Sequence, residues 1–318
     1  MATGLVYDPI YIEHDTGAHP ECPERLILTV KHLVETGLMS ELVLINPRAA
    51  EIDDIRMVHD SAMIDLVFQV CRIGGGYLDM DTPASPKSCE AAMKAVGGLF
   101  EAADAVMKGT VENALCLVRP PGHHATPERS MGFCLFNNIA ICAKYLQKKH
   151  GVGKILIVDF DVHHGNGTQD AFWEDPSVMF FSIHRFPFYP GSGAANEQGG
   201  KDGLGFTVNV PVRGSISSGE FIEKFAAVLD GKAKEFAPEF VLVSAGFDAY
   251  VNDPIGSLCL DAPDYRTITD IIVDLARESA GGRIVSTLEG GYHLTALPLL
   301  IEAHLKGLMR SPIQGAIK

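Results

Sequence analysis

The sequence predicts an α/β protein built as a three-layer sandwich, with helices on both faces of a central, mainly parallel sheet. Short apolar runs alternate with longer segments of helical periodicity along the whole chain. Residues 155–158 are Ile-Leu-Ile-Val, as expected of a strand that is buried on both faces of a parallel sheet. No linker, repeat or compositional break divides the chain, so we expect a single domain over residues 1–318.

The helices are predicted from apolar residues that recur every three or four positions and from the residues that end each segment. The first helix has apolar residues at positions 26, 27, 30, 33 and 34, and Gly37 ends it. Asp261 caps a later helix and Pro263 lies in its first turn, where proline is tolerated. The predicted helices are residues 25–36, 61–72, 88–108, 137–150, 218–236, 261–280 and 294–309.

The strands are predicted from apolar stretches of three to six residues that lie between the helices. Two longer segments, 74–86 and 184–205, are rich in Gly and Pro and are predicted as loops. The first of these loops carries Asp79 and Asp81. The predicted strands are residues 5–7, 42–45, 114–118, 154–158, 178–183, 206–210, 240–245 and 283–288.

Composition limits the classes of function. The formal net charge of −14 argues against direct nucleic-acid binding, which requires clustered Lys and Arg. No apolar run approaches about 18 residues, so we expect neither a signal peptide nor a membrane span. The seven cysteines contain no C-x-x-C pair, which is typical of reduced thiols in a cytoplasmic protein. The oligomeric state is left open.

Polar residues follow the predicted strands at their carboxyl ends, where open parallel sheets bind ligands. Asp161 and His163 follow the strand at 154–158 and are two residues apart, so an extended backbone directs both side chains the same way. Asp248 follows the strand at 240–245. Together they form a plausible mononuclear metal site with an open position for water, as in catalytic zinc sites. The alternative is that these are ordinary loop and capping residues.

Further candidate groups follow other strands. His123 and His124 come after Pro-Pro-Gly, which holds the backbone in a rigid turn, and paired imidazoles suit general acid–base catalysis. Tyr292 follows two glycines and could donate a hydrogen bond to an oxyanion. His184 follows the strand at 178–183. Loop histidines and a core tyrosine are the competing interpretations.

Three aromatic residues lie on two loops at the same predicted edge of the sheet and could line an apolar channel. Packing in the core is the competing interpretation. These residues are Phe133, Phe188 and Tyr189.

Six motifs in this order resemble those of the histone deacetylase and acetylpolyamine amidohydrolase family, over residues 7 to 308. The resemblance is closest to the class II branch and its prokaryotic relatives. It implies an arginase-like fold. The motifs are Arg-Pro-Pro-Gly-His-His at 119–124, Gly-Phe-Cys-Leu-Phe-Asn-Asn at 132–138, Asp-Phe-Asp-Val-His-His-Gly-Asn-Gly at 159–167, Tyr-Pro-Gly-Ser-Gly at 189–193, Ser-Ala-Gly-Phe-Asp at 244–248 and Glu-Gly-Gly-Tyr at 289–292.

The resemblance implies a zinc ion held by Asp161, His163 and Asp248, and hydrolysis of N-acetyl (or longer acyl) lysine side chains with release of acetate. His124 would be the general base and His123 would assist it electrostatically. Asp159 would orient His123, and Asn166 would orient His124. Tyr292 would stabilise the oxyanion.

The resemblance also implies the substrate contacts. Phe133 and Tyr189 would form the walls of the acyl-lysine tunnel beside Gly132, and Tyr189 stands where many relatives have Phe. Asp81 would hold the substrate backbone, although this match is loose. Arg25 would lie near an inner acetate channel.

A potassium ion is a further implied ligand. The family binds this ion near the zinc, partly through backbone carbonyl groups. The matching positions are Asp159, Asp161, His163, Ser182 and Ile183.

Three alternatives remain. An acetylpolyamine deacetylase would place a glutamate after Asp253-Pro254, where this chain has Ile255. A binuclear manganese ureohydrolase would have an aspartate two residues after His163, where this chain has Gly165. A catalytically silent acetyl-lysine-binding or metal-binding module would lack part of the catalytic set, whereas every expected group is present. Either an acyl-lysine peptide or a small acylated amine therefore remains possible as the substrate.

Overall fold

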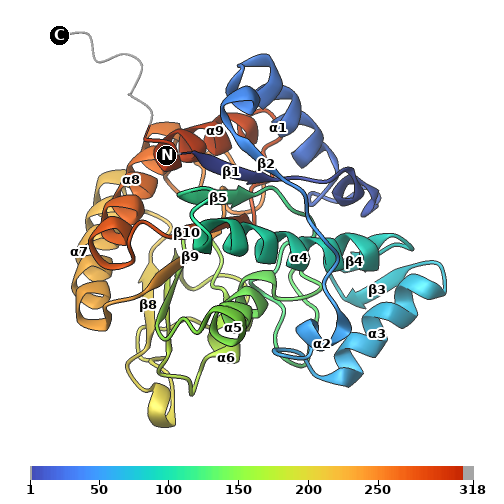
Figure 1. Ribbon diagram of the computed structural model, residues 1–318, viewed down its shortest axis with the longest axis horizontal. Coiled ribbons are helices and arrows are strands. Elements are labelled where there is room, and N and C mark those ends of the chain that lie inside the picture. Colours follow the sequence, from blue (N-terminus) through green and yellow to red (C-terminus); the bar gives the residue numbers. More distant parts are fainter. Residues whose placement is uncertain (1, 311–318) are drawn as a thin grey trace.

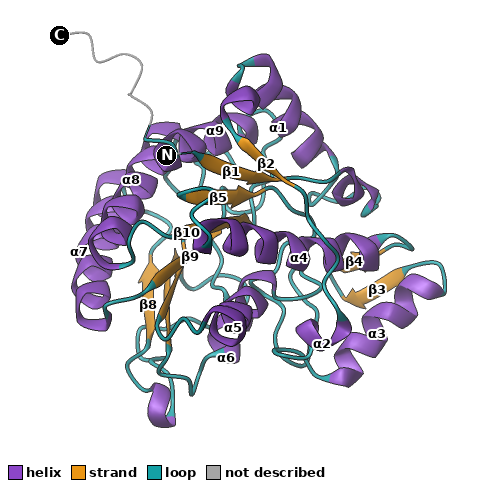
Figure 2. Cartoon of the chain, in the orientation of Figure 1, coloured by secondary structure: helices purple, strands orange, loops and turns teal. Residues whose placement is uncertain are grey.

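The eight predicted strands form one sheet in which every neighbouring pair is parallel, in the order β2-β1-β5-β10-β9-β6-β7-β8 (Figures 1 and 2). The structure is a computed structural model, and it describes residues 2–310. The strands are β1 (Thr3–Val6), β2 (Val43–Ile45), β5 (Asn113–Cys116), β6 (Ile155–Asp159), β7 (Val178–Arg185), β8 (Thr207–Val212), β9 (Phe240–Ala245) and β10 (Ile284–Leu288).

Helices cover both faces of this sheet, which confirms the predicted three-layer α/β class (Figure 1). Helices α7, α8, α9 and α1 pack side by side on one face, and α4 and α5 pack together on the other. The bounds are α1 (Glu24–Glu35), α2 (Ile52–Ile55), α3 (Ser61–Arg72), α4 (Ser88–Met107), α5 (Asn138–His150), α6 (Asn166–Ala171), α7 (Ser218–Phe236), α8 (Ala262–Ser279) and α9 (Leu297–Leu308).

The centre of the sheet is buried on both faces. Every residue of β5, β6, β9 and β10 is buried, which explains why these strands are mostly apolar and do not alternate between apolar and polar residues. Because the strands are parallel and in register, the segments that follow β5, β6, β9 and β10 leave the sheet at the same edge. That edge carries the candidate site.

Two local predictions were wrong. The segment at 74–86, predicted as a loop, contains an antiparallel hairpin of β3 (Gly76–Asp79) and β4 (Thr82–Ala84) that packs against α3. Its glycine and proline residues suggested a loop, but tertiary packing supports the two short strands. The chain after residue 183 does not open into a loop at once, because β7 continues to Arg185 and includes His184.

The structure also bears on the predictions for membrane spans, cysteines, domain boundaries and short helices. Within residues 2–310, no helix combines the length and the apolar character needed to cross a bilayer. All seven cysteines are free thiols. The expected domain boundaries at residues 1 and 318 lie outside the described residues. Helices α2 and α6, of four and six residues, were not predicted because they are too short to show a periodicity.

Alanine substitution of one glycine in α4 and one in α7 can test how closely α4 packs on the backbone of Arg48. A Cβ atom at Gly97 would lie 2.1 Å from the backbone oxygen of Arg48, whereas one at Gly231 in α7 would have no neighbour within 4 Å. We expect Gly97→Ala to lower the free energy of unfolding by about 1–3 kcal/mol. Gly231→Ala should raise it by about 0.5–1 kcal/mol, because alanine favours the helix. Urea denaturation of both variants measures the free energy of unfolding. Equal changes in this free energy for the two variants would contradict the close packing at Gly97.

Candidate active site

Three side chains from the ends of two neighbouring strands meet in one buried cluster. Asp161 and His163 follow β6, and Asp248 follows β9, which pairs with β6. The Nδ1 atom of His163 lies 3.0 Å from Oδ1 of Asp161 and 3.0 Å from Oδ2 of Asp248. All three side chains are buried, and their ligand atoms lie close enough to hold one metal ion. The structure therefore brings together the predicted metal-ligand residues.

The chemistry of the cluster suits a divalent cation. Burial and the neighbouring Asp161 raise the pKa of Asp248 to about 7. Burial alone would lower the pKa of His163, but Asp248 and Asp161 outweigh it and raise that pKa to about 10. Buried carboxylates that lack a cation are costly, and carboxylate oxygens and imidazole nitrogens are both zinc ligands. Ligands bound tetrahedrally at about 2.0–2.1 Å lie about 3.3 Å apart, close to the separations found here.

Backbone groups hold the two carboxylates in place. The Gly290 N–H donates to Oδ2 of Asp161 at 2.8 Å, and the Val162 N–H donates to Oδ1 of Asp248 at 2.9 Å. A Cβ atom at Gly290 would lie 2.2 Å from Asp248, so only glycine permits this approach. These bonds leave Oδ1 of Asp161 and Oδ2 of Asp248 turned toward His163.

Position 165, two residues after His163, leaves no space for a side chain. A side chain there would begin 2.2 Å from Oδ2 of Asp159. This strand end therefore offers no carboxylate at position 165 for a second divalent ion.

The paired histidines lie beside the cluster and have different electrostatic environments. His123 Nδ1 is 2.9 Å from Oδ2 of Asp159, and the carboxylates of Asp159 and Asp161 overcome the effect of burial and raise the pKa of His123 to about 10. His124 Nδ1 is 2.8 Å from Oδ1 of Asn166. Burial and the nearby His123 lower the pKa of His124 well below its usual value. The centroids of the two rings are 4.0 Å apart, so two imidazoles whose pKa values are shifted in opposite directions lie side by side.

Glu289 is a further important residue of the site. Its Oε2 accepts hydrogen bonds from the N–H groups of Gly122 and His123, at 2.7 and 3.2 Å, and its Oε1 accepts one from Ser244 Oγ at 3.0 Å. Glu289, which follows β10, therefore links the backbone of residues 122 and 123 to Ser244 in β9. Sequence reasoning placed it in a motif but gave it no role. A carboxylate at the end of a buried strand was the signal that could have singled it out.

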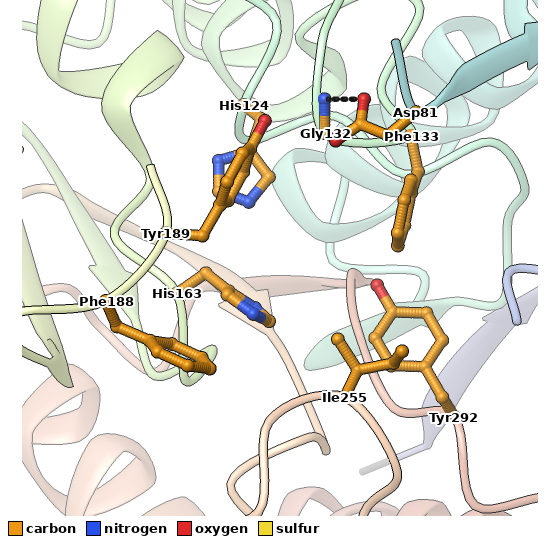
Figure 3. Close-up of a pocket in the computed structure, with 9 residues that line it drawn as sticks. All are labelled: Asp81, His124, Gly132, Phe133, His163, Phe188, Tyr189, Ile255 and Tyr292. Atoms are coloured by element: carbon orange, nitrogen blue, oxygen red, sulfur yellow. Dashed lines mark hydrogen bonds between the residues drawn. The ribbon is translucent and has the colours of Figure 1, made fainter. Parts of the chain in front are cut away.

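A pocket of about 260 Å³ opens above the cluster, and Figure 3 shows the side chains around it. Aromatic rings form much of its wall. Phe133 meets Tyr292 edge to face at 5.7 Å, and Phe188 stacks on His163 at 5.2 Å. The lining residues are Asp81, His124, Gly132, Phe133, His163, Phe188, Tyr189, Ile255 and Tyr292.

At the rim of the pocket, hydrogen bonds join the β3–β4 hairpin to the segment between β5 and α5. Oδ1 of Asp81 accepts hydrogen bonds from the Gly132 N–H at 3.2 Å and from Thr82 Oγ1 at 2.8 Å. Burial and the nearby negative charge of Asp81 raise the pKa of the Tyr189 hydroxyl. Tyr189 and Ile255 are 37% and 36% exposed, so both lie at the mouth of the pocket.

A buried ionic network lies next to Tyr292. The Arg25 guanidinium is 5.0 Å from the centre of the Tyr292 ring, and its Nε donates to the Gly291 carbonyl at 2.7 Å. Glu21 pairs with Arg25 at 2.9 Å and with Arg119 at 2.6 Å. Sequence reasoning identified Arg25 but gave no role to Glu21 or Arg119, whose contacts lie far apart in the sequence.

Two other predicted positions lie on β7. Ser182 pairs with Asp159 in the register of β6 and β7, and Ile183 follows it, so both are adjacent to the cluster. His184 was expected beside the other groups, but it lies within β7 and does not line the pocket. Its Nδ1 contacts Ser182 Oγ at 2.9 Å and its Nε2 contacts the Gly193 carbonyl at 2.8 Å.

Known proteins resemble this chain in sequence and in fold. Residues 19–308 match the histone deacetylase domain. Human histone deacetylase 9 is 38% identical over 351 residues, which cover 98% of this chain and 34% of that protein. A probable deacetylase from Archaeoglobus fulgidus is 38% identical over 94% of this chain and 84% of its own length. Histone deacetylase 5 of Arabidopsis thaliana is 38% identical over 92% of this chain and 47% of its own length.

The chain thus spans about a third of the human protein and about half of the Arabidopsis one. The crystal structure of the HDA15 HD domain superposes with a TM-score of 0.92 at 38% identity, and the match covers 98% of this chain and 90% of that one. Domain match, sequence identity and fold all agree. The chain belongs to the histone deacetylase family.

Proposed function

We propose that this protein is a zinc-dependent deacetylase that hydrolyses N-acetyl-lysine side chains in proteins or peptides, releasing acetate, with residues 1–318 acting as one domain. The observation that carries the proposal is the convergence of a metal-ligand cluster, an acid–base pair and a phenol around one pocket. Zinc, when held by Asp161, His163 and Asp248, would polarise the amide carbonyl and lower the pKa of water.

His124 is the proposed general base. The Asn166 Oδ1 atom is an acceptor, so His124 Nδ1 carries the proton and donates a hydrogen bond to it, which leaves Nε2 with a lone pair. The depressed pKa keeps this ring neutral near pH 7, ready to accept a proton from the attacking water. The same ring then delivers that proton to the leaving lysine amine.

His123 and Tyr292 are proposed to stabilise charge. The His123 Nδ1–H donates a hydrogen bond to Oδ2 of Asp159, and the raised pKa of His123 keeps this ring cationic beside His124. Tyr292 lines the pocket, and Figure 3 shows its hydroxyl directed inward. That hydroxyl can donate to the oxygen of the substrate carbonyl as it becomes an oxyanion.

The pocket suits an unbranched acylated chain. Phe133 and Tyr189 are proposed to flank the methylene groups of lysine, with Gly132 beside them and Asp81 at the mouth. Arg25 borders the inner end and is proposed to lie on the route by which acetate leaves. A structural potassium ion is proposed next to the zinc, held by Asp159, Asp161, His163, Ser182 and Ile183.

The second candidate function is deacetylation of acetylated polyamines or another small acylated amine. Such a substrate carries a further ammonium group, which a carboxylate at the mouth would attract. Ile255 occupies that position and is apolar. This observation favours an acyl-lysine side chain over a polyamine.

Removal of the metal should abolish turnover of an acetyl-lysine peptide, and addition of zinc should restore it at about one ion per chain.

Asp248→Asn should lose most of its zinc and at least about 10²-fold in kcat, since a metal ligand is removed. Metal analysis and peptide hydrolysis check both. Asp53→Asn is the control, because Asp53 is exposed in α2. Full activity of the metal-free protein would contradict the proposal.

Tyr292→Phe should reduce kcat by about 10²–10³-fold, because the oxyanion would lose one donor. Zinc content and thermal stability should stay unchanged, since the hydroxyl is not a proposed zinc ligand. Peptide hydrolysis and metal analysis on the same sample separate these effects. Tyr250→Phe, outside the pocket, serves as the control. An unchanged kcat would remove Tyr292 from the mechanism.

Ile255→Glu should shift substrate preference toward acetylated polyamines. A carboxylate at the half-exposed mouth would attract the distal ammonium and raise kcat/KM for acetylspermidine by about threefold to tenfold at low salt. Activity on a neutral acetyl-lysine peptide should change less. Ile255→Gln controls for size and polarity. Equal effects of Glu and Gln would show that charge at this position does not select the substrate.

A further inference from the structure

A ring of hydrogen bonds outside the catalytic cluster holds the loop that follows β7. Residues 186–197 of this loop, here called the wall loop, carry Phe188 and Tyr189, which line the pocket. Figure 3 shows both side chains on one side of the pocket, across from Phe133 and Tyr292. The position of the wall loop therefore sets the width of the pocket.

Gln169, in α6, is buried at the centre of this ring. Its Nε2 donates to Oε2 of Glu197 at 2.7 Å. Its Oε1 accepts from Nδ2 of Asn209 at 2.7 Å and lies 3.1 Å from Nε2 of His164. A carboxylate only accepts, so the NH2 group of Gln169 must face Glu197 and its oxygen must face His164. Nε2 of His164 therefore carries a proton and donates a hydrogen bond to that oxygen.

Both ends of the ring close on the wall loop. Oε1 of Glu197 accepts hydrogen bonds from the backbone N–H groups of residues 193 and 194, both at 3.0 Å. At the other end, Nδ1 of His164 lies 2.8 Å from Oγ of Ser192. The ring thus ties the backbone that closely follows Tyr189 to α6.

The same ring joins the wall loop to the segment that carries the catalytic groups. His164 directly follows His163, a residue of the metal-ligand cluster. Helix α6 begins at Asn166, whose Oδ1 lies 2.8 Å from Nδ1 of His124. The aromatic wall and the catalytic groups are therefore held to one short stretch of chain.

We propose that Gln169 and Glu197 are positioning residues that fix the wall loop, and so determine how tightly the pocket holds an acyl-lysine side chain. Neither residue lines the pocket, so both act through Phe188 and Tyr189 rather than on the substrate. Without the ring, the wall would move away from the methylene groups of lysine. This inference rests on the proposed function of the pocket and deepens it.

The test exchanges the two side chains of the central hydrogen bond. Gln169→Glu sets one carboxylate against another, and Glu197→Gln brings an NH2 group against another donor in either orientation of its amide. In the double variant, Gln169→Glu with Glu197→Gln, every donor again faces an acceptor. Gln198→Glu is the control, because it makes the same charge change on an exposed side chain of the neighbouring position.

Each single variant should raise KM for an acetyl-lysine peptide about threefold to tenfold, the effect of losing contact with about one methylene group. The value of kcat should change by less than about threefold and zinc content should stay the same, because the metal ligands are not members of the ring. The double variant should return KM to within about twofold of the wild-type value. The control should leave KM within about twofold as well.

A merely structural role for the ring gives a different result. Partial unfolding would lower Tm and kcat in the single variants and leave KM unchanged. That result would overturn the inference. A double variant whose KM is no lower than that of the more impaired single variant would also overturn it.

A measurement that does not need turnover separates this inference from the proposed function. Calorimetry gives Kd for the same peptide on the wild type and on each variant. If the wild type binds the peptide without hydrolysing it, the proposed function fails while the Kd values still decide the inference. Weaker binding by both single variants, restored in the double variant, supports it, and any other pattern overturns it. A wild type that neither binds nor hydrolyses the peptide overturns both.

Discussion

The site depends on the cost of burying negative charge at one edge of a parallel sheet. Four carboxylates, those of Asp159, Asp161, Asp248 and Glu289, are buried where β6, β9 and β10 end. An ionised carboxylate in a low-dielectric interior requires partners for its charge. Backbone N–H groups, two histidine rings and the proposed metal ion supply them. The neighbouring loops lie where each can bring a hydrogen-bond donor to one of these carboxylate oxygens.

Glycine residues allow backbone N–H groups to approach the buried carboxylates closely enough to donate hydrogen bonds to them. The chain after β10 approaches Asp161 and Asp248 so closely that a Cβ at Gly290 would overlap Asp248, and a Cβ at Gly246 would lie 2.2 Å from Asp161. The gain is the direct hydrogen bond from the Gly290 N–H. A bond to a charged acceptor is about twice as strong as a neutral one. Gly246 and Gly290 are therefore required because of this close approach.

Much of the fold and the site could be predicted from sequence because the signals are local. Buried parallel strands are apolar runs, and Asp161, His163 and Asp248 follow such runs directly, so their convergence follows from parallel topology. What could not be predicted depends on contacts between distant segments. The β3–β4 hairpin exists because it packs on α3, and His184 is drawn into β7 by its pairing with β8. The ion pair of Glu21 with Arg119 and the bonds of Glu289 to residues 122 and 123 likewise join segments far apart in the chain.

The network of Arg25, Glu21 and Arg119 connects the interior of the protein to the proposed oxyanion donor. Two guanidinium groups share one buried carboxylate, so one positive charge remains after pairing, and the π-face of Tyr292 and the carbonyls of residues 289 and 291 surround Arg25. A cation against an aromatic ring is attracted by its quadrupole, more strongly when water is excluded. Arg25 thus orients the ring whose hydroxyl enters the pocket, while Asp253 fixes the backbone of Tyr292 through a 2.7 Å hydrogen bond. The phenol is held from two sides before a substrate arrives, which is the preorganisation that charge stabilisation requires.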